Sequence, residues 1–297
     1  TWQNVSGTIS SSVNWGSNAR VKVTGLLTIA SGATLTIGAG SVIVVAADTE
    51  IAVNGTIATS GTVQEPVVFT SQNRTAPWGG FLFQASTSVG NFNGTIFTAS
   101  GADANWFGNN ASGDFYHKPQ QCLFYLSNSA HVTATDCYMI ENAGQLGHGE
   151  PGYLTLQRCL VQKLITGGQY NSGGVNVQDS AIIEAPYAGA PFVDADNDAF
   201  YLNGGPHSFT NTLFGWTLDD CIDAGEGTTG AVTFTGCWFE SSMHEALAIS
   251  SGPRYATVTD TVITNCGQAM ESGYGGANID ADNCLATGNI IGARFGD

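Results

Sequence analysis

The few charged residues of this chain concentrate in residues 218–225, which read LDDCIDAG. Asp219, Asp220 and Asp223 place three carboxyl groups within five residues, although only 11% of the chain is charged. Carboxylates this close repel one another, and at least one pKa rises unless a metal ion or a cationic group offsets the repulsion. A protonated carboxyl group beside an ionised one is the pair that acid–base catalysis uses.

Three other segments share the same order of polar, small and apolar residues: DNDAFYL (196–202), MHEALAIS (243–250) and CGQAMESG (266–273). Aligned on the small residue, the four segments give three polar columns: Asn197, Asp219, His244 and Gly267; Asp198, Asp220, Glu245 and Gln268; and Tyr201, Asp223, Ala248 and Glu271. Members of the second column are 22, 25 and 23 residues apart. If one structural repeat separates them, the carboxyl groups form a line on one face of the protein.

The second half of the chain carries such a repeat. The segments TDCYMI, QRCLVQ, QDSAII, TNTLFG, TGCWFE, TDTVIT and DNCLAT have a small residue in third place: Cys137, Cys159, Ser180, Thr212, Cys237, Thr261 and Cys284. Successive spacings are 22, 21, 32, 25, 24 and 23 residues, which is typical of a solenoid. The segments are short, rich in Val, Ile, Thr and Phe, and bounded by turn residues, so they predict strands.

These features predict an all-β protein, a single-stranded parallel β-helix of about a dozen rungs stacked about 4.8 Å apart. We expect one domain over residues 1–297, with N-terminal rungs at 1–100, a long loop at 101–121 and the site-bearing rungs at 122–297. The repeated cysteines are expected as buried thiols in the core, with a disulfide between adjacent rungs as the alternative. The segments TLTIG (34–38), PVVFTS (66–71) and PWGG (77–80) resemble the opening of secreted right-handed β-helices, which implies the same fold.

The site segments NDA (197–199), DDCI (219–222) and HEA (244–246) resemble the motifs of polygalacturonase-type glycoside hydrolases. The resemblance implies that Asp219 is the general acid, that Asp198 and Asp220 activate the attacking water, and that His244 orients the aspartates or touches the substrate. The remaining column residues are expected to line the substrate groove. These substrate-binding candidates are Tyr201, Asp223, Glu245, Gln268 and Glu271, with Arg254 and Arg294 as the few bases that can reach it.

The chain departs from that family where the family binds the substrate carboxylate. A segment of the form R-I-K is replaced by QAMES (268–272), and the chain has a net charge of −16. A polyuronate would be repelled unless cations bridged the two. The departure therefore favours a neutral, amino or otherwise different glycan over polygalacturonate.

Two alternatives stay open. The carboxylates also resemble those of calcium-dependent β-helix pectate lyases, with Asp198, Asp220 and Asp223 as oxygen ligands for Ca²⁺. Such a lyase needs a cationic base one rung later in the third column, where this chain has Ala248. The other alternative is a non-catalytic glycan-binding solenoid or adhesin. Hydrolysis itself requires no cofactor, and Ca²⁺ remains possible.

The composition limits the classes of binding partner that the chain can have. With 24 acids against 8 bases, the chain is a poor ligand for nucleic acid or an anionic membrane, since both require basic residues. We expect a secreted monomer acting on a polysaccharide or oligosaccharide, and five glycosylation sequons at Asn4, Asn54, Asn73, Asn93 and Asn110 hint at secretion. The pair His148 and Glu150 in GHGEP is read as a polar turn, with a substrate-groove role as the alternative.

Overall fold

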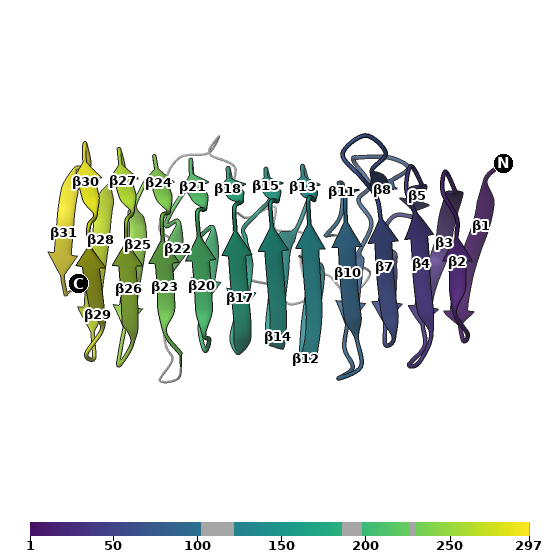
Figure 1. Cartoon of the computed structure of the whole chain (residues 1–297), viewed down its shortest axis with the longest axis horizontal. Helices are drawn as coiled ribbons and strands as arrows, with labels where there is room; N and C mark the ends of the chain where they lie inside the picture. Colours follow the sequence, from purple (N-terminus) through teal and green to yellow (C-terminus); the bar gives the residue numbers. More distant parts are fainter. Residues whose placement is uncertain (102–121, 186–197, 226–229, 297) are drawn as a thin grey trace.

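The computed structural model describes residues 1–101, 122–185, 198–225 and 230–296. These residues form an all-β parallel solenoid of about 11 rungs, in which each rung passes through three stacks of strands. Figure 1 shows the rungs following one another along the long axis, from the N-terminus at one end to the C-terminus at the other. The described residues contain no helix long and apolar enough to cross a membrane.

The first stack carries the candidate site. It consists of the end of β1 (Gln3–Ile9), the end of β3 (Arg20–Ile29), β6 (Glu50–Val53), β9 (Gly80–Phe83), the start of β12 (Cys122–Thr135), the start of β14 (Gln145–Gln157), β16 (Gly168–Tyr170), β19 (Phe200–Leu202), β22 (Ile222–Asp223), β25 (Glu245–Ser251), β28 (Gln268–Tyr274) and β31 (Ile291–Phe295).

The second stack follows the first in each rung. It consists of β2 (Val13–Trp15), β4 (Thr34–Gly38), β7 (Thr56–Ser60), β10 (Val89–Asn93), the remainder of β12 and β14, β17 (Gly173–Gln178), β20 (His207–Thr210), β23 (Val232–Thr235), β26 (Tyr255–Thr259) and β29 (Asn278–Asp282).

The third stack closes each rung. It consists of the start of β1 and β3, β5 (Val42–Val45), β8 (Val67–Ser71), β11 (Thr95–Phe97), β13 (Tyr138–Ile140), β15 (Leu160–Gln162), β18 (Ala181–Ile183), β21 (Leu213–Gly215), β24 (Trp238–Glu240), β27 (Val262–Thr264) and β30 (Leu285–Thr287). The pairings between successive rungs are parallel in all three stacks, as the repeat predicted.

The core lies inside the three stacks because side chains in a strand point alternately inward and outward. Strand β4 shows this alternation, with Leu35 and Ile37 buried and their neighbours partly exposed. Equivalent side chains then stack from rung to rung. The ring centroids of Phe209 and Phe234 are 5.0 Å apart, and those of Phe214 and Phe239 are also 5.0 Å apart. The rings of each pair are nearly parallel.

The backbone conformation at the corner between the second and third stacks explains why a small residue recurs there. The residue before it has a positive φ, as at Asp179 (φ 50°) and Asp260 (φ 51°). Asp and Asn tolerate this conformation better than most residues. The small side chain then turns back onto the chain: the hydroxyl of Ser180 donates to the carbonyl of Gln178 at 2.7 Å, and that of Thr261 to Thr259 at 2.9 Å.

The cysteines at this corner behave as the core residues that the repeat predicted. Cys137, Cys159 and Cys237 are buried, and Cys284 is half-buried in the last described rungs. All seven cysteines of the chain are free thiols. Residues 102–121, most of the expected long loop, lie outside the described residues together with Asn197 and the sequon at Asn110.

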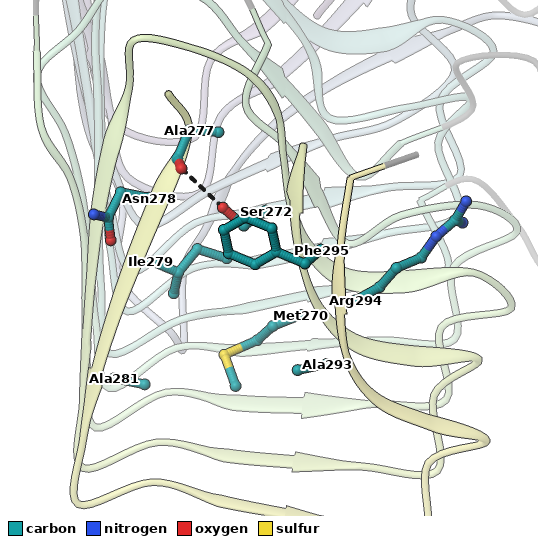
Figure 2. Close-up of a pocket in the computed structure, with 9 residues that line it drawn as sticks. All are labelled: Met270, Ser272, Ala277, Asn278, Ile279, Ala281, Ala293, Arg294 and Phe295. Carbon is teal, nitrogen blue, oxygen red and sulfur yellow. Dashed lines mark hydrogen bonds between the residues drawn. The ribbon is translucent and has the colours of Figure 1, made fainter. Parts of the chain in front are cut away.

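The core opens onto a pocket of about 220 Å³ in the last described rungs. Figure 2 shows Met270, Ile279 and Phe295 around this pocket, whereas the side chain of Arg294 extends away from them. Strand alternation explains the difference, because Arg294 and Phe295 are neighbours on β31 and point to opposite sides. Arg294 therefore lies toward the outer face of the first stack.

Candidate functional site

The third polar column is present in the register that the alignment predicted. Tyr201 pairs with Asp223, Asp223 with Ala248, and Ala248 with Glu271. Arg294 extends the same column by one more rung, next to Glu271. These side chains share the outer face of the first stack because the buried residues beside them, such as Phe200, Ile222 and Leu247, point into the core.

The second column is joined by hydrogen bonds that run from rung to rung. The backbone N–H of Asp220 donates to Oδ1 of Asp198 at 3.3 Å, and the N–H of Glu245 donates to Oδ1 of Asp220 at 2.8 Å. Each carboxyl group thus satisfies a backbone donor of the following rung. All three residues are buried, with relative exposures of 2%, 7% and 2% in chain order.

These columns line a pocket of about 240 Å³ on the outer face of the first stack. Its lining residues are Asp198, Asp219, Asp220, Asp223, His244, Glu245, Ala248, Ser250, Glu271, Tyr274 and Arg294. All four residues expected to be catalytic are therefore brought together with Asp223, Glu245 and Glu271, expected to bind substrate, and with Arg294, expected to reach the groove.

His244 is the cationic centre of this group. Its Nδ1 lies 3.3 Å from Oδ1 of Asp219 and 3.4 Å from Oδ1 of Asp220, and it also contacts Oε2 of Glu245. These carboxyl groups, with Asp219 contributing most, raise the pKa of His244 to about 12. The imidazole therefore carries a positive charge at neutral pH.

Asp220 and Glu245 have pKa values displaced in opposite directions. Burial raises the pKa of Asp220 well above its ordinary value, and the adjacent Glu245 adds to the rise, although His244 opposes it. Burial also acts to raise the pKa of Glu245, but hydrogen bonds with His244 and Asp220 outweigh burial and lower it. The two adjacent carboxyl groups therefore differ in proton affinity, with Asp220 favouring its protonated form and Glu245 its ionised form.

Buried hydroxyl groups hold the backbone beneath these acids. The hydroxyl of Ser242 lies 2.6 Å from the carbonyl oxygen of Asp219 and 2.7 Å from that of Glu245, so it bridges two rungs. The hydroxyl of Thr217 donates to the same Asp219 carbonyl at 3.1 Å. The positions of the acids are therefore fixed by the core side of the strands.

Neutral side chains donate hydrogen bonds to the outer carboxyl groups, those of Asp223 and Glu271. The hydroxyl of Ser250 donates to Oδ1 of Asp223 at 2.7 Å, and the side-chain amide of Gln268 donates to Oε2 of Glu271 at 3.2 Å. The guanidinium of Arg294 lies 3.6 Å from the same Glu271 oxygen. Gln268, expected to bind substrate, is itself buried and positions Glu271 instead of lining the pocket.

Arg254 does not reach this pocket, contrary to the expectation from the sequence. Its guanidinium is buried and donates to the carbonyl oxygens of Gly204, at 2.7 Å, and Gly225, at 3.2 Å. It therefore ties together the chain segments that follow β19 and β22. Tyr201 holds its expected place in the third column but does not line the pocket.

The structure also groups residues that could contact a metal ion. Asp219, Asp220 and His244 present ligand atoms within 4.8 Å of one another. This set differs from the expected Asp198, Asp220 and Asp223, and it suits calcium poorly. Calcium takes six to eight oxygen ligands, whereas here the protonated imidazole of His244 contacts the carboxyl groups.

Ser250 and Tyr274 line the pocket but were not identified from the sequence. Ser250 could have been identified from the sequence, because it stands two residues after Ala248 on β25 and so faces the same side. His148 and Glu150 lie within strand β14 instead of a turn, with Nε2 of His148 at 2.9 Å from Oε1 of Glu150. They share the first stack with the pocket, with β16 and β19 between them and β22.

Comparison with known families bears on the N-terminal part of the chain. Residues 7–114 match the model of a pectate-lyase-like β-helix domain. The matched range ends well before Asp198, so it bears on the N-terminal rungs and the fold, and not on the residues of the pocket. No curated protein and no solved structure matches the chain.

Proposed function

We propose that this protein is a glycoside hydrolase that cleaves a polysaccharide at the carboxyl-lined pocket. The observation that carries the proposal is the line of buried carboxyl groups of Asp198, Asp220 and Glu245 at an open pocket, where the pKa of Asp220 is raised and that of Glu245 is lowered. Glycosidic hydrolysis requires a carboxyl group that donates a proton and a second, ionised one that acts on water or on the sugar. The match to a pectate-lyase-like β-helix domain supports a polysaccharide-related function.

In this mechanism Asp220 is the general acid. The resemblance in sequence implied Asp219 for that role, but burial raises the pKa of Asp220 well above its ordinary value, so Asp220 is the acid that favours its protonated form. We therefore assign proton donation to Asp220 and activation of water to Asp219 and Asp198. His244 holds the carboxylates in place, and Glu245 adds negative charge that stabilises the developing oxocarbenium ion.

The test is a panel of polysaccharides scored for new reducing ends. The wild-type protein should release reducing ends from at least one neutral or amino glycan. Asp220→Asn should lower the rate by about 10²- to 10⁴-fold, the usual contribution of a general acid, with an unchanged circular dichroism spectrum. Substrates with a good leaving group need less protonation and should restore part of the rate. If Asp220→Asn keeps full activity, the assignment fails.

Calcium-dependent elimination is the second candidate, favoured by the family match and by Arg294, a cation in the third column. Arg294 stands three rungs after Asp223, whereas the lyase pattern places its base one rung after, at Ala248. A lyase would yield unsaturated products that absorb ultraviolet light, and a chelator would abolish its activity. Reducing ends without that absorbance, unaffected by chelator, support hydrolysis.

A further inference from the structure

The charges around the pocket are strongly unequal. Six of its lining residues are acids, whereas His244 and Arg294 are its two bases. Even with the proton on Asp220, ionisable acids outnumber the bases by five to two. Both bases already face carboxyl groups, His244 at Asp219 and Arg294 at Glu271. The lining therefore matches a cationic ligand and opposes an anionic one.

The side chain of Glu245 gives a second, independent observation, because one of its two carboxylate oxygens lacks a hydrogen-bond donor among the described residues. Its side chain is 2% exposed and its Oε2 contacts His244. Its Oε1 is buried and has no hydrogen-bond partner among the described residues. Buried carboxylate oxygens are costly when they lack a donor, and Glu245 lines the pocket. A ligand with a charged N–H donor would supply what this oxygen lacks.

Ala248 separates the two outer acids in the third column. Asp223 lies one rung before it and Glu271 one rung after it, so the carboxyl groups flank a gap of roughly 10 Å by the usual strand spacing. The alanine methyl group leaves this gap unfilled. Ser250 and Gln268 fix the two carboxyl groups at its sides, and a sugar ring fits a space of this width.

We propose that the pocket recognises an oligosaccharide of amino sugars with free, protonated amines, which bind Asp223, Glu245 and Glu271. This inference rests on the proposed function for the location of the substrate, but it concerns recognition and can be tested without turnover. It excludes polyuronates, whose carboxylates would meet the acids, and it disfavours sugars whose amines are acetylated.

The test uses two glucosamine oligomers of equal length, one fully deacetylated and one fully N-acetylated, so that the two ligands differ at the amine. Binding to the full chain is measured by calorimetry at mildly acidic pH with EDTA present. The deacetylated oligomer should bind at least tenfold more tightly, which corresponds to about 1.4 kcal/mol. Asp223→Asn and Glu271→Gln should each weaken its binding by about tenfold.

Asp280→Asn is the matched control, because it removes one negative charge on β29 in the second stack, away from the pocket. It should leave the dissociation constant within twofold. Equal or tighter binding of the acetylated oligomer would overturn the inference. Cleavage of a neutral glycan without amine preference would overturn it while sparing the hydrolase. Amine-selective binding without cleavage of any glycan would support it and refute the hydrolase.

Discussion

At the scale of single residues, the proposed chemistry depends on which groups of the pocket carry protons. Three carboxyl groups and one imidazole form a connected group in which the pKa of His244 is raised to about 12 and that of Asp220 is raised well above its ordinary value. The sequence predicted that such a group exists, because the repeat placed the acids in one line. It did not indicate which acid keeps its proton, since burial and the distance to His244 decide that.

Asp220 should make stability depend on pH. Its pKa in the folded protein is raised above the ordinary value of 3.8, so its contribution to stability is full below that value and is lost as the pH rises through the folded pKa. Asp220→Asn cannot ionise and should remove this loss. The measurement is the melting temperature of both proteins over a pH series.

The expected result is a difference between variant and wild type that grows in favour of the variant as the pH rises. The exposed acid Asp280, changed to Asn, provides the control and should give a difference that does not grow. A difference for Asp220→Asn that is constant from acid to neutral pH would contradict a raised pKa.

His244 should stabilise the fold through its contacts with the three acids. Its raised pKa, about 12, means that this stabilisation is full below its ordinary value of 6.5 and disappears only as the pH rises toward 12. His244→Gln removes the cation and should lower the free energy of unfolding by about 1–3 kcal/mol at neutral pH. Urea unfolding measures this quantity.

His131→Gln is the comparison for that experiment, since His131 stacks on Tyr153 in the second stack and faces no part of the pocket. Its change should stay within about 0.5 kcal/mol, as for most surface substitutions. If both histidine variants lose the same small amount, His244 does not hold the acids together.

At the scale of elements, the register of the first stack was predictable from the sequence. Ala199, Cys221, Ala246 and Ala269 aligned because each occupies the same buried position, where the space admits only a small side chain. Contacts that depend on the connecting segments were not predictable. Arg254 illustrates this, because its partners Gly204 and Gly225 lie 50 and 29 residues away in segments of irregular length.

Substitutions of the two arginines expected near the groove should change different properties, stability for Arg254 and glycan binding for Arg294. Arg254→Gln removes a buried guanidinium from two carbonyl groups and should cost about 1–3 kcal/mol of stability, without changing which glycan binds. Arg294→Gln removes a partly exposed cation beside Glu271 and should change stability by less than about 1 kcal/mol. It should strengthen binding of a cationic oligosaccharide.

Thermal unfolding and calorimetry of the two arginine variants test this contrast. If the Arg254 variant has wild-type stability but an altered glycan preference, Arg254 acts in glycan binding, and its structural role is contradicted.

Gly267 should be required for the position of His244. A Cβ added at Gly267 would lie 2.6 Å from the carbonyl oxygen of Met243 and 2.8 Å from that of His244, closer than packed atoms approach. Gly267→Ala should therefore shift the His244 backbone and lower the rate of glycan cleavage. At Gly292 in β31 a Cβ would meet nothing within 4 Å, so Gly292→Ala should retain the wild-type rate. Equal rates for the two alanine variants would show that the close approach has no role.

At the scale of the whole molecule, repetition made the fold predictable. Each rung presents the same inward pattern, and neighbouring rungs bury one another, as in other solenoids. The same repetition brings residues from 198 to 294 into one pocket, although almost a hundred residues separate them in the chain. A long parallel face with one acid-rich pocket suits a polymer that lies along the strand stack.

The pocket gives this elongated molecule a strongly localised charge. The chain carries a net charge of −16, and six of its acids line this one site. Part of the basis for the proposed preference for cationic glycans was therefore visible in the composition. The placement of Ser250, Tyr274 and Arg294 around those acids depended on the register of the last three strands of the first stack.

The decisive experiment measures the release of reducing ends from a panel of neutral, amino and uronate polysaccharides, with wild-type protein and Asp220→Asn compared with and without chelator. A glycoside hydrolase that uses Asp220 as its general acid should release reducing ends from a neutral or amino glycan, give no unsaturated product, and lose at least about a hundredfold in rate in the variant. Unsaturated products that vanish with chelator, or an undiminished rate for Asp220→Asn, would contradict this mechanism.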